Sequence, residues 1–122
     1  MLVTLVYPRV QFDFGAIKLL KVELESLGIK RPLFMTDRGL VQAGVFAAVQ
    51  RAMGDANDLA VFDEVPENPT YDGVMRAVAT YQANRSDGIV AVGGGSVIDS
   101  AKAVSVVARH GGHIRDYVGR PE

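Results

Sequence analysis

The sequence contains no cysteine and no tryptophan, and its charges nearly cancel, with 13 Lys and Arg against 14 Asp and Glu. The absence of cysteine excludes disulfides, thiolate metal sites and thiol catalysis. Near-neutral charge disfavours a protein that binds the phosphate backbone of nucleic acids. No apolar run approaches the roughly 20 residues that cross a bilayer, and the stretch Met1–Val6 lacks the basic residues of a signal peptide. We therefore expect a cytoplasmic domain without nucleic-acid or membrane partners.

The composition is that of a globular protein, with 48% hydrophobic and 22% charged residues in a chain of 122. This length suits one domain with its own core. Apolar residues recur at helical spacing over 16–27, and Gly28 is placed to end that helix in the left-handed conformation. The same periodicity predicts three further helices, over 41–53, from Thr70 through Tyr81, and from Ser96 to Gly111.

Between these helices lie short segments that are almost wholly apolar, over 32–37, 59–62 and 88–92. Strands of that kind are buried on both faces, so the alternation predicts an α/β fold, a three-layer Rossmann-like parallel sheet with helices on both faces. The segment 3–14, with Pro8 in its middle, is different. It predicts a small N-terminal antiparallel hairpin at the edge of the sheet.

Ligands of open parallel sheets bind at the carboxyl ends of the strands, where the run Gly93-Gly94-Gly95-Ser96 is expected. Glycines allow a phosphate to approach the backbone closely, and the helix that follows offers free N–H groups and a positive dipole end. Ser96 can cap this helix, contact the anion, or do both. The alternative is a glycine-rich turn that only connects two elements. The run is neither a G-x-G-x-x-G fingerprint nor a Walker loop.

Two other features are expected at the same edge. Asp37 ends the predicted strand over 32–37, where a carboxylate accepts both ribose hydroxyls of an adenosine and repels a 2′-phosphate. Capping of the following turn is its alternative role. The loop Pro66-Glu67-Asn68-Pro69-Thr70 either shapes a pocket wall or simply leads into a helix.

Asp99 and Lys102 lie three residues apart on one face of the predicted fourth helix. They either form a surface ion pair or, in the case of Asp99, fix the glycine loop by accepting its N–H groups. His110 and His113 flank two glycines, but a metal centre needs three or four ligands. We expect both histidines to be exposed loop residues and no metal site in this chain.

The run from Gly93 to Ala103 resembles the G-G-G-S-x-x-D-x-A-K-A signature of iron-containing (group III) alcohol dehydrogenases. Shorter segments agree with that family in order and spacing, namely Phe14-Gly15, Leu27-Gly28, Met35-Thr36-Asp37, Val65–Thr70 and Ile114–Tyr117. Glycerol dehydrogenases and dehydroquinate synthases share the glycine loop and its Asp. Ser96 together with Asn68-Pro69 fits the alcohol dehydrogenases better.

The resemblance implies that several of these residues contact the cofactor. Gly94, Gly95 and Ser96 would hold the pyrophosphate of NAD. Asp37 would bind the adenosine ribose and favour NAD over NADP.

Further residues match the family in the same way. Asn68 and Pro69 would border the adenine side of the cofactor. Asp99 and Lys102 would support the glycine loop.

Family members continue beyond this length into a helical domain that supplies one Asp and three His to iron or zinc. The resemblance therefore implies that residues 1–122 are the NAD-binding domain of a longer two-domain enzyme, inactive alone and without catalytic or metal-ligating residues of its own. In the full-length enzyme the metal would polarise the oxygen of a small alcohol or aldehyde while a hydride moves to or from NAD. Family likeness also suggests a homodimer.

The competing hypothesis is a non-catalytic α/β nucleotide-binding module of the same layered architecture. Its receiver-like version needs a cluster of acidic residues at a strand end, whereas Asp37 stands alone and Lys102 lies on a helix. A general nucleotide-binding module remains an alternative.

Overall fold

A computed structural model describes residues 15–54 and 58–117 and contains a parallel sheet of three strands in the order β2-β1-β3. The strands are β1 (Pro32–Met35), β2 (Ala60–Phe62) and β3 (Gly88–Ala91). Leu33 of β1 lies opposite Ala60 on one side and Ile89 on the other. All three strands point the same way, so their carboxyl ends share one edge.

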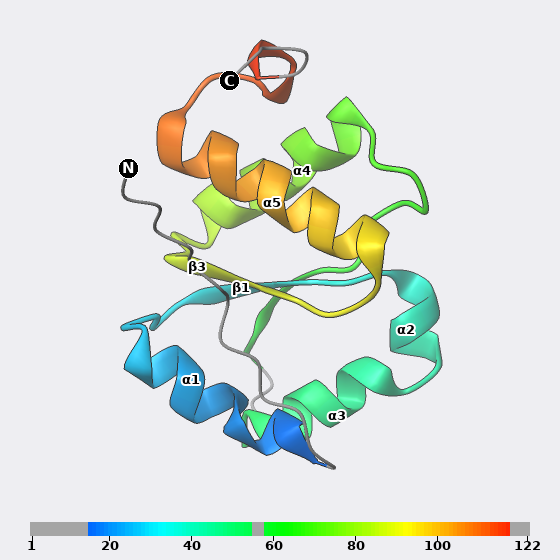
Figure 1. Cartoon of the computed structure of the whole chain (residues 1–122), viewed down its shortest axis with the longest axis vertical. Helices are drawn as coiled ribbons and strands as arrows, with labels where there is room; N and C mark the ends of the chain where they lie inside the picture. The colour runs from blue at the N-terminus through cyan, green and yellow to red at the C-terminus, as the bar shows by residue number, and fades with distance from the viewer. Residues whose placement is uncertain (1–14, 55–57, 118–122) are drawn as a thin grey trace, which may run out of the picture.

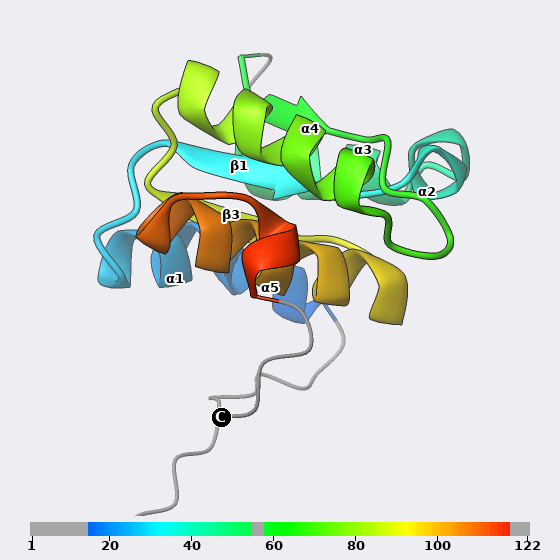
Figure 2. The ribbon, with the colours of Figure 1, turned by 90° about the horizontal axis from the view of Figure 1, so that it is seen from above.

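Helices cover both faces of this sheet (Figure 1). One face carries η1 (Ala16–Leu19), α1 (Leu20–Ser26) and α3 (Val45–Ala52), and α2 (Arg38–Gln42) follows the end of β1. The other face carries α4 (Tyr71–Ala83), α5 (Gly95–His110) and η2 (Ile114–Asp116). Figure 2 shows α4 and α5 side by side over the sheet. The predicted three-layer α/β fold is confirmed.

The central strand β1 shows why helices pack on both faces of the sheet. Leu33 and Met35 point into the core formed with α4 and α5, whereas Phe34 packs with Phe46 and Val49 of α3 on the opposite face. The Phe34 and Phe46 rings meet edge to face with centroids 6.0 Å apart. Since side chains alternate along a strand, an apolar residue at every position requires an apolar layer on each side.

The three strands and the helices α4 and α5 lie within two residues of their predicted positions. The helix predicted over 16–27 is divided into the 3-10 helix η1 and the α-helix α1. The single helix predicted over 41–53 is wrong, because Gly44 adopts a left-handed φ of 83° and separates α2 from α3. Gly28 is left-handed after α1, as predicted, with φ 72°. Thr70 caps α4 by accepting a hydrogen bond from the Gly73 amide at 3.0 Å. The hairpin predicted over 3–14 lies outside the described residues, and no helix within 15–54 and 58–117 is both long and apolar enough to cross a membrane.

A carboxylate joins the two turns at the amino ends of β1 and β3. Asp87 accepts hydrogen bonds from the Lys30 amide at 2.9 Å and the Arg31 amide at 2.8 Å. In the opposite direction, the Arg31 guanidinium donates to the Asn84 carbonyl at 2.8 and 2.9 Å. The two amide hydrogen bonds lower the pKa of Asp87 below its ordinary value.

Asp87→Asn is expected to remove a contribution to stability that depends on pH. Because the pKa of the folded carboxyl is lowered, this contribution is complete above the unfolded value of about 3.8 and disappears as the pH falls through the lower folded value. Urea unfolding of the wild type and the variant, measured between neutral and acid pH, checks this. The difference between them should shrink in acid. Asp72→Asn is the control, and an equal pH dependence in both variants would contradict the assignment.

Candidate functional site

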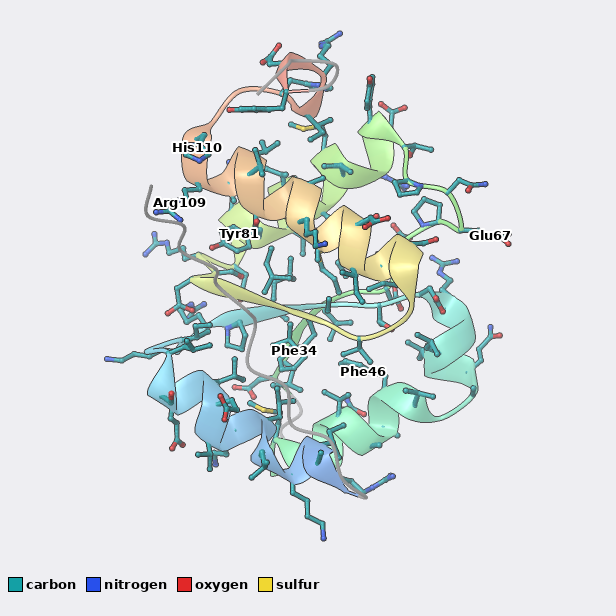
Figure 3. All side chains as sticks on the ribbon, in the orientation of Figure 1. Phe34, Phe46, Glu67, Tyr81, Arg109 and His110 are labelled. Carbon is teal, nitrogen blue, oxygen red and sulfur yellow. The ribbon has the colours of Figure 1, made fainter. Side chains whose placement is uncertain are left out.

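The carboxyl edge of the sheet is hollowed into a cavity of about 390 Å³. Three connections line it, the ones that follow β1, β2 and β3. Its lining residues are Asp37, Arg38, Gly39, Val65, Pro66, Glu67, Gly94, Gly95, Ser96 and Val97. Glu67 marks this edge in Figure 3. Four residues predicted at the cofactor, Asp37, Gly94, Gly95 and Ser96, therefore lie around one cavity.

The glycines of the loop before α5 differ in what they do. Gly93 has a φ of 154°, and a Cβ there would lie 2.7 Å from the Val97 Cγ2 atom and 3.0 Å from the Leu40 Cδ1 atom. Gly94 has an ordinary φ of −88°. A Cβ on Gly94 or Gly95 would meet nothing within 4 Å. The fold thus requires a glycine at 93, while the two glycines that line the cavity leave open space in front of the backbone.

This open space lies at the amino end of a long helix. The first hydrogen bond of α5 runs from the Ile98 amide to the Gly94 carbonyl at 3.1 Å. The amides of residues 95–97 come before it and have no acceptor within the helix. They add to the positive end of the dipole of a 16-residue helix. Chemically, this is an anion site that a phosphate can approach without steric hindrance.

Ser96 does not cap α5, so that prediction is wrong. The N-cap is Gly94, which provides no side-chain hydrogen bond. The Ser96 hydroxyl instead donates to the Glu67 carbonyl, in the connection after β2. This bond ties the first turn of α5 to the loop after β2, and both residues line the cavity. Contact of Ser96 with an anion stays a prediction.

Asp37 does fill its alternative role as a cap. One carboxylate oxygen, Oδ1, accepts a hydrogen bond from the Leu40 amide at 2.8 Å and begins α2. An ionised carboxylate has about four acceptor sites on its two oxygens. Capping therefore leaves Oδ2 able to accept from another donor, and the ribose role of Asp37 stays a prediction compatible with the cap.

The remaining predicted residues lie outside this cavity. Asn68 and Pro69 are exposed on the loop beyond Glu67. Asp99 and Lys102 are exposed on α5, and within the described part of the chain neither the expected ion pair between them nor a hydrogen bond from Asp99 to the glycine loop is present. The cofactor roles of these four residues stay predictions.

Lys102 lines a larger cavity of about 560 Å³ between β3 and α5. Tyr81, Asp87 and Arg109 line the same cavity. Figure 3 labels Tyr81 and Arg109, which lie on the side of the molecule away from Glu67. Burial, and secondly the negative charge of Asp87, raise the pKa of the Tyr81 hydroxyl. This cavity has no glycine loop and no helix amino terminus, so we place the candidate site in the smaller cavity.

The prediction that His113 is an exposed loop residue is wrong. His113 is half-buried and begins η2, where its Nδ1 atom accepts from the Arg115 amide at 3.1 Å. His110 is exposed at the end of α5. Among residues 15–54 and 58–117 no group of three or more metal-binding side chains comes together.

Sequence reasoning did not identify Arg38 as a residue of the site. Arg38 lines the cavity, and its guanidinium contacts the Glu64 carboxylate at 2.7 Å. The available signal was its position, since it directly follows Asp37 at the end of a buried strand.

Most of this chain is similar in sequence to known dehydrogenases. Residues 8–122 match the family described as iron-containing alcohol dehydrogenase. The 4-hydroxybutyrate dehydrogenase of Cupriavidus necator is 50% identical over 111 residues, covering 89% of this chain and 28% of that protein. This chain thus spans little more than a quarter of that relative's length.

Solved structures of dehydrogenases and reductases share the fold of this chain. The NADH-dependent butanol dehydrogenase A of Thermotoga maritima superposes with a TM-score of 0.75 at 30% identity, covering 88% of this chain and 28% of that one. The sulfoacetaldehyde reductase of Bifidobacterium kashiwanohense, solved in complex with NAD+, gives a TM-score of 0.76 at 25% identity, with the same coverage of 88% and 28%.

Proposed function

Because the chain belongs to the iron-containing alcohol dehydrogenase family, we propose that residues 1–122 form the NAD-binding domain of a metal-dependent alcohol dehydrogenase. The observation that carries this proposal is the contrast within the glycine loop. Gly94 and Gly95 have no neighbour that a side chain would strike, yet they line the cavity together with Asp37. A glycine that the fold does not need, at the amino end of a helix, suits a backbone that a phosphate approaches closely.

In this proposal the residues in and beside the cavity contact different parts of NAD. The amides of residues 95–97 donate to the pyrophosphate, and Asp37 accepts from the ribose hydroxyls of the adenosine. Asn68 and Pro69 border the adenine. When bound, NAD+ would accept the hydride in the oxidation of an alcohol, and NADH would supply it in the reduction of an aldehyde.

Asp99 and Lys102 support the loop from the exposed side of α5. The relatives are much longer than this chain. We assign the iron or zinc ligands and the pocket for the alcohol or aldehyde to the remainder of the enzyme, and we propose that the enzyme is a homodimer.

The proposal is tested by titrating the protein with NAD and with AMP while following backbone amide shifts. We expect the largest shifts for the amides of residues 93–97 and 37–39. A folded protein whose amides do not respond at millimolar ligand would contradict an autonomous cofactor site. Shifts centred on the cavity beside Tyr81 would contradict the location.

Asp37→Asn is expected to narrow the preference for NAD over NADP by about fivefold to tenfold. The amide keeps an oxygen to accept from the Leu40 amide, so the cap of α2 survives. The negative charge that repels a 2′-phosphate is lost, and two unit charges about 4 Å apart in water interact by about 1 kcal/mol, which corresponds to about fivefold in affinity. Parallel titrations with both cofactors measure the ratio. Asp37→Gly, which also loses the ribose acceptor, should weaken NAD itself, and an unchanged ratio in both variants would remove Asp37 from this role.

A further inference from the structure

Arg38 lies between two cavities at the carboxyl edge of the sheet. It lines the proposed cofactor cavity and also a shallower one of about 320 Å³, which it shares with Glu64, Val65 and Arg76. Its side chain is 68% exposed, and its Nη2 atom lies 2.7 Å from the Glu64 Oε1 atom. The guanidinium next to the candidate ribose site is therefore held by a carboxylate outside the cavity.

Glu64 also has a second arginine partner. Its second oxygen, Oε2, faces the Arg76 guanidinium on α4 at 3.5 Å, so each carboxylate oxygen has a different arginine as partner. The adjacent residue Val65 is buried, and its amide donates to the Thr36 carbonyl at the end of β1. The backbone and Arg76 together place the Glu64 carboxylate where Arg38 reaches it.

An arginine near the acid that follows such a strand is the group that accepts the 2′-phosphate of NADP in dinucleotide-binding sheets. This chain has both groups, Asp37 and Arg38, in succession. We propose that Glu64 is a specificity-determining residue, which binds Arg38 and thereby withholds its guanidinium from a 2′-phosphate. This inference rests on the proposed function, because it assumes that the adenosine ribose lies at Asp37.

The strength of the Arg38–Glu64 ion pair limits how much Glu64 can change the affinity for a 2′-phosphate. An exposed ion pair shifts an equilibrium by about fivefold at most. Glu64 therefore biases Arg38 and does not lock it, and Asp37 supplies the rest of the discrimination. Removing the Glu64 charge also lessens repulsion of the 2′-phosphate, so the part due to Arg38 has to be separated by a second substitution.

The test compares 5′-AMP with 2′,5′-ADP as ligands, by calorimetry or amide shifts at low ionic strength. The wild type should prefer 5′-AMP. Glu64→Gln should bind 2′,5′-ADP about fivefold more tightly, with the affinity for 5′-AMP unchanged within about twofold. Glu64→Ala should show the same gain. The gain should largely disappear when Arg38→Gln is added to Glu64→Gln.

Glu25→Gln is the charge-matched control, since it removes one exposed carboxylate from α1 on the other face of the sheet, and it should change neither affinity. This inference is overturned if Glu64→Gln gains the same affinity for 2′,5′-ADP with and without Arg38, or if neither Glu64 variant gains affinity. In both cases binding of 5′-AMP would still support the proposed function. If the folded wild type binds neither ligand, the proposed function fails and this inference fails with it.

Discussion

Gly95→Ala is expected to lower the affinity for NAD at least about tenfold, or about 1.4 kcal/mol, while the protein stays as stable as the wild type. Gly95 is the first residue of α5, and a Cβ built on it meets no atom within 4 Å. Alanine is a better helix former than glycine, so the fold loses nothing. In a helix the Cα–Cβ bond tilts toward the amino terminus, which directs the new methyl group into the space proposed for the pyrophosphate.

Two measurements on the same preparations check this prediction. Calorimetry with NAD gives the affinity, and urea unfolding gives the free energy of unfolding. Gly94→Ala should weaken NAD binding similarly, because its neighbourhood is equally open, but with a small loss of stability, since Gly94 is the N-cap of α5 and alanine is a poor N-cap residue. Ser105→Thr is the matched control, since it adds a methyl group to the same helix outside this cavity, beside the larger one. Wild-type affinity in both glycine variants would show that the cofactor does not approach this backbone.

The layered fold could be predicted because its signals are local. Each strand is short and apolar at nearly every position, and β1 shows what that composition means, with Leu33 and Phe34 buried on opposite faces. The strand order β2-β1-β3 has no such local signal. Gly44 shows the limit within one helix, since the apolar spacing on either side of it is continuous although its own left-handed backbone breaks the helix.

The site was predicted in outline because strand ends fall at one edge of a parallel sheet. Its details depend on contacts between distant segments. Ser96 is a favourable capping residue by type, but its hydroxyl bonds the carbonyl of Glu67, 29 residues earlier. Arg38 meets Glu64 across 26 residues for the same reason, since β1 and β2 lie side by side. No short window of sequence contains either pair.

Gly93→Ala is expected to destabilise the protein by about 2–6 kcal/mol, although it lies only two residues before Gly95. Gly93 has a φ of 154°, a conformation that costs a residue with a side chain about 1–3 kcal/mol. Its Cβ would also lie 2.7 Å from Val97 Cγ2. Val97 is 1% exposed within the core, so it cannot move aside without disturbing α4 and the sheet. Overpacking of this kind adds about 1–3 kcal/mol.

Urea unfolding followed by circular dichroism measures the loss, with Gly95→Ala as the matched control for the same chemical change. A loss of this size is a large share of the roughly 5–15 kcal/mol that holds a domain together. Because Gly93 anchors the loop that presents Gly94 and Gly95 to the cavity, any weakening of NAD binding in Gly93→Ala should accompany the loss of stability. In Gly95→Ala, NAD binding should weaken without a loss of stability. If Gly93→Ala is as stable as Gly95→Ala, the division of the loop into a structural glycine and two ligand-facing glycines is wrong.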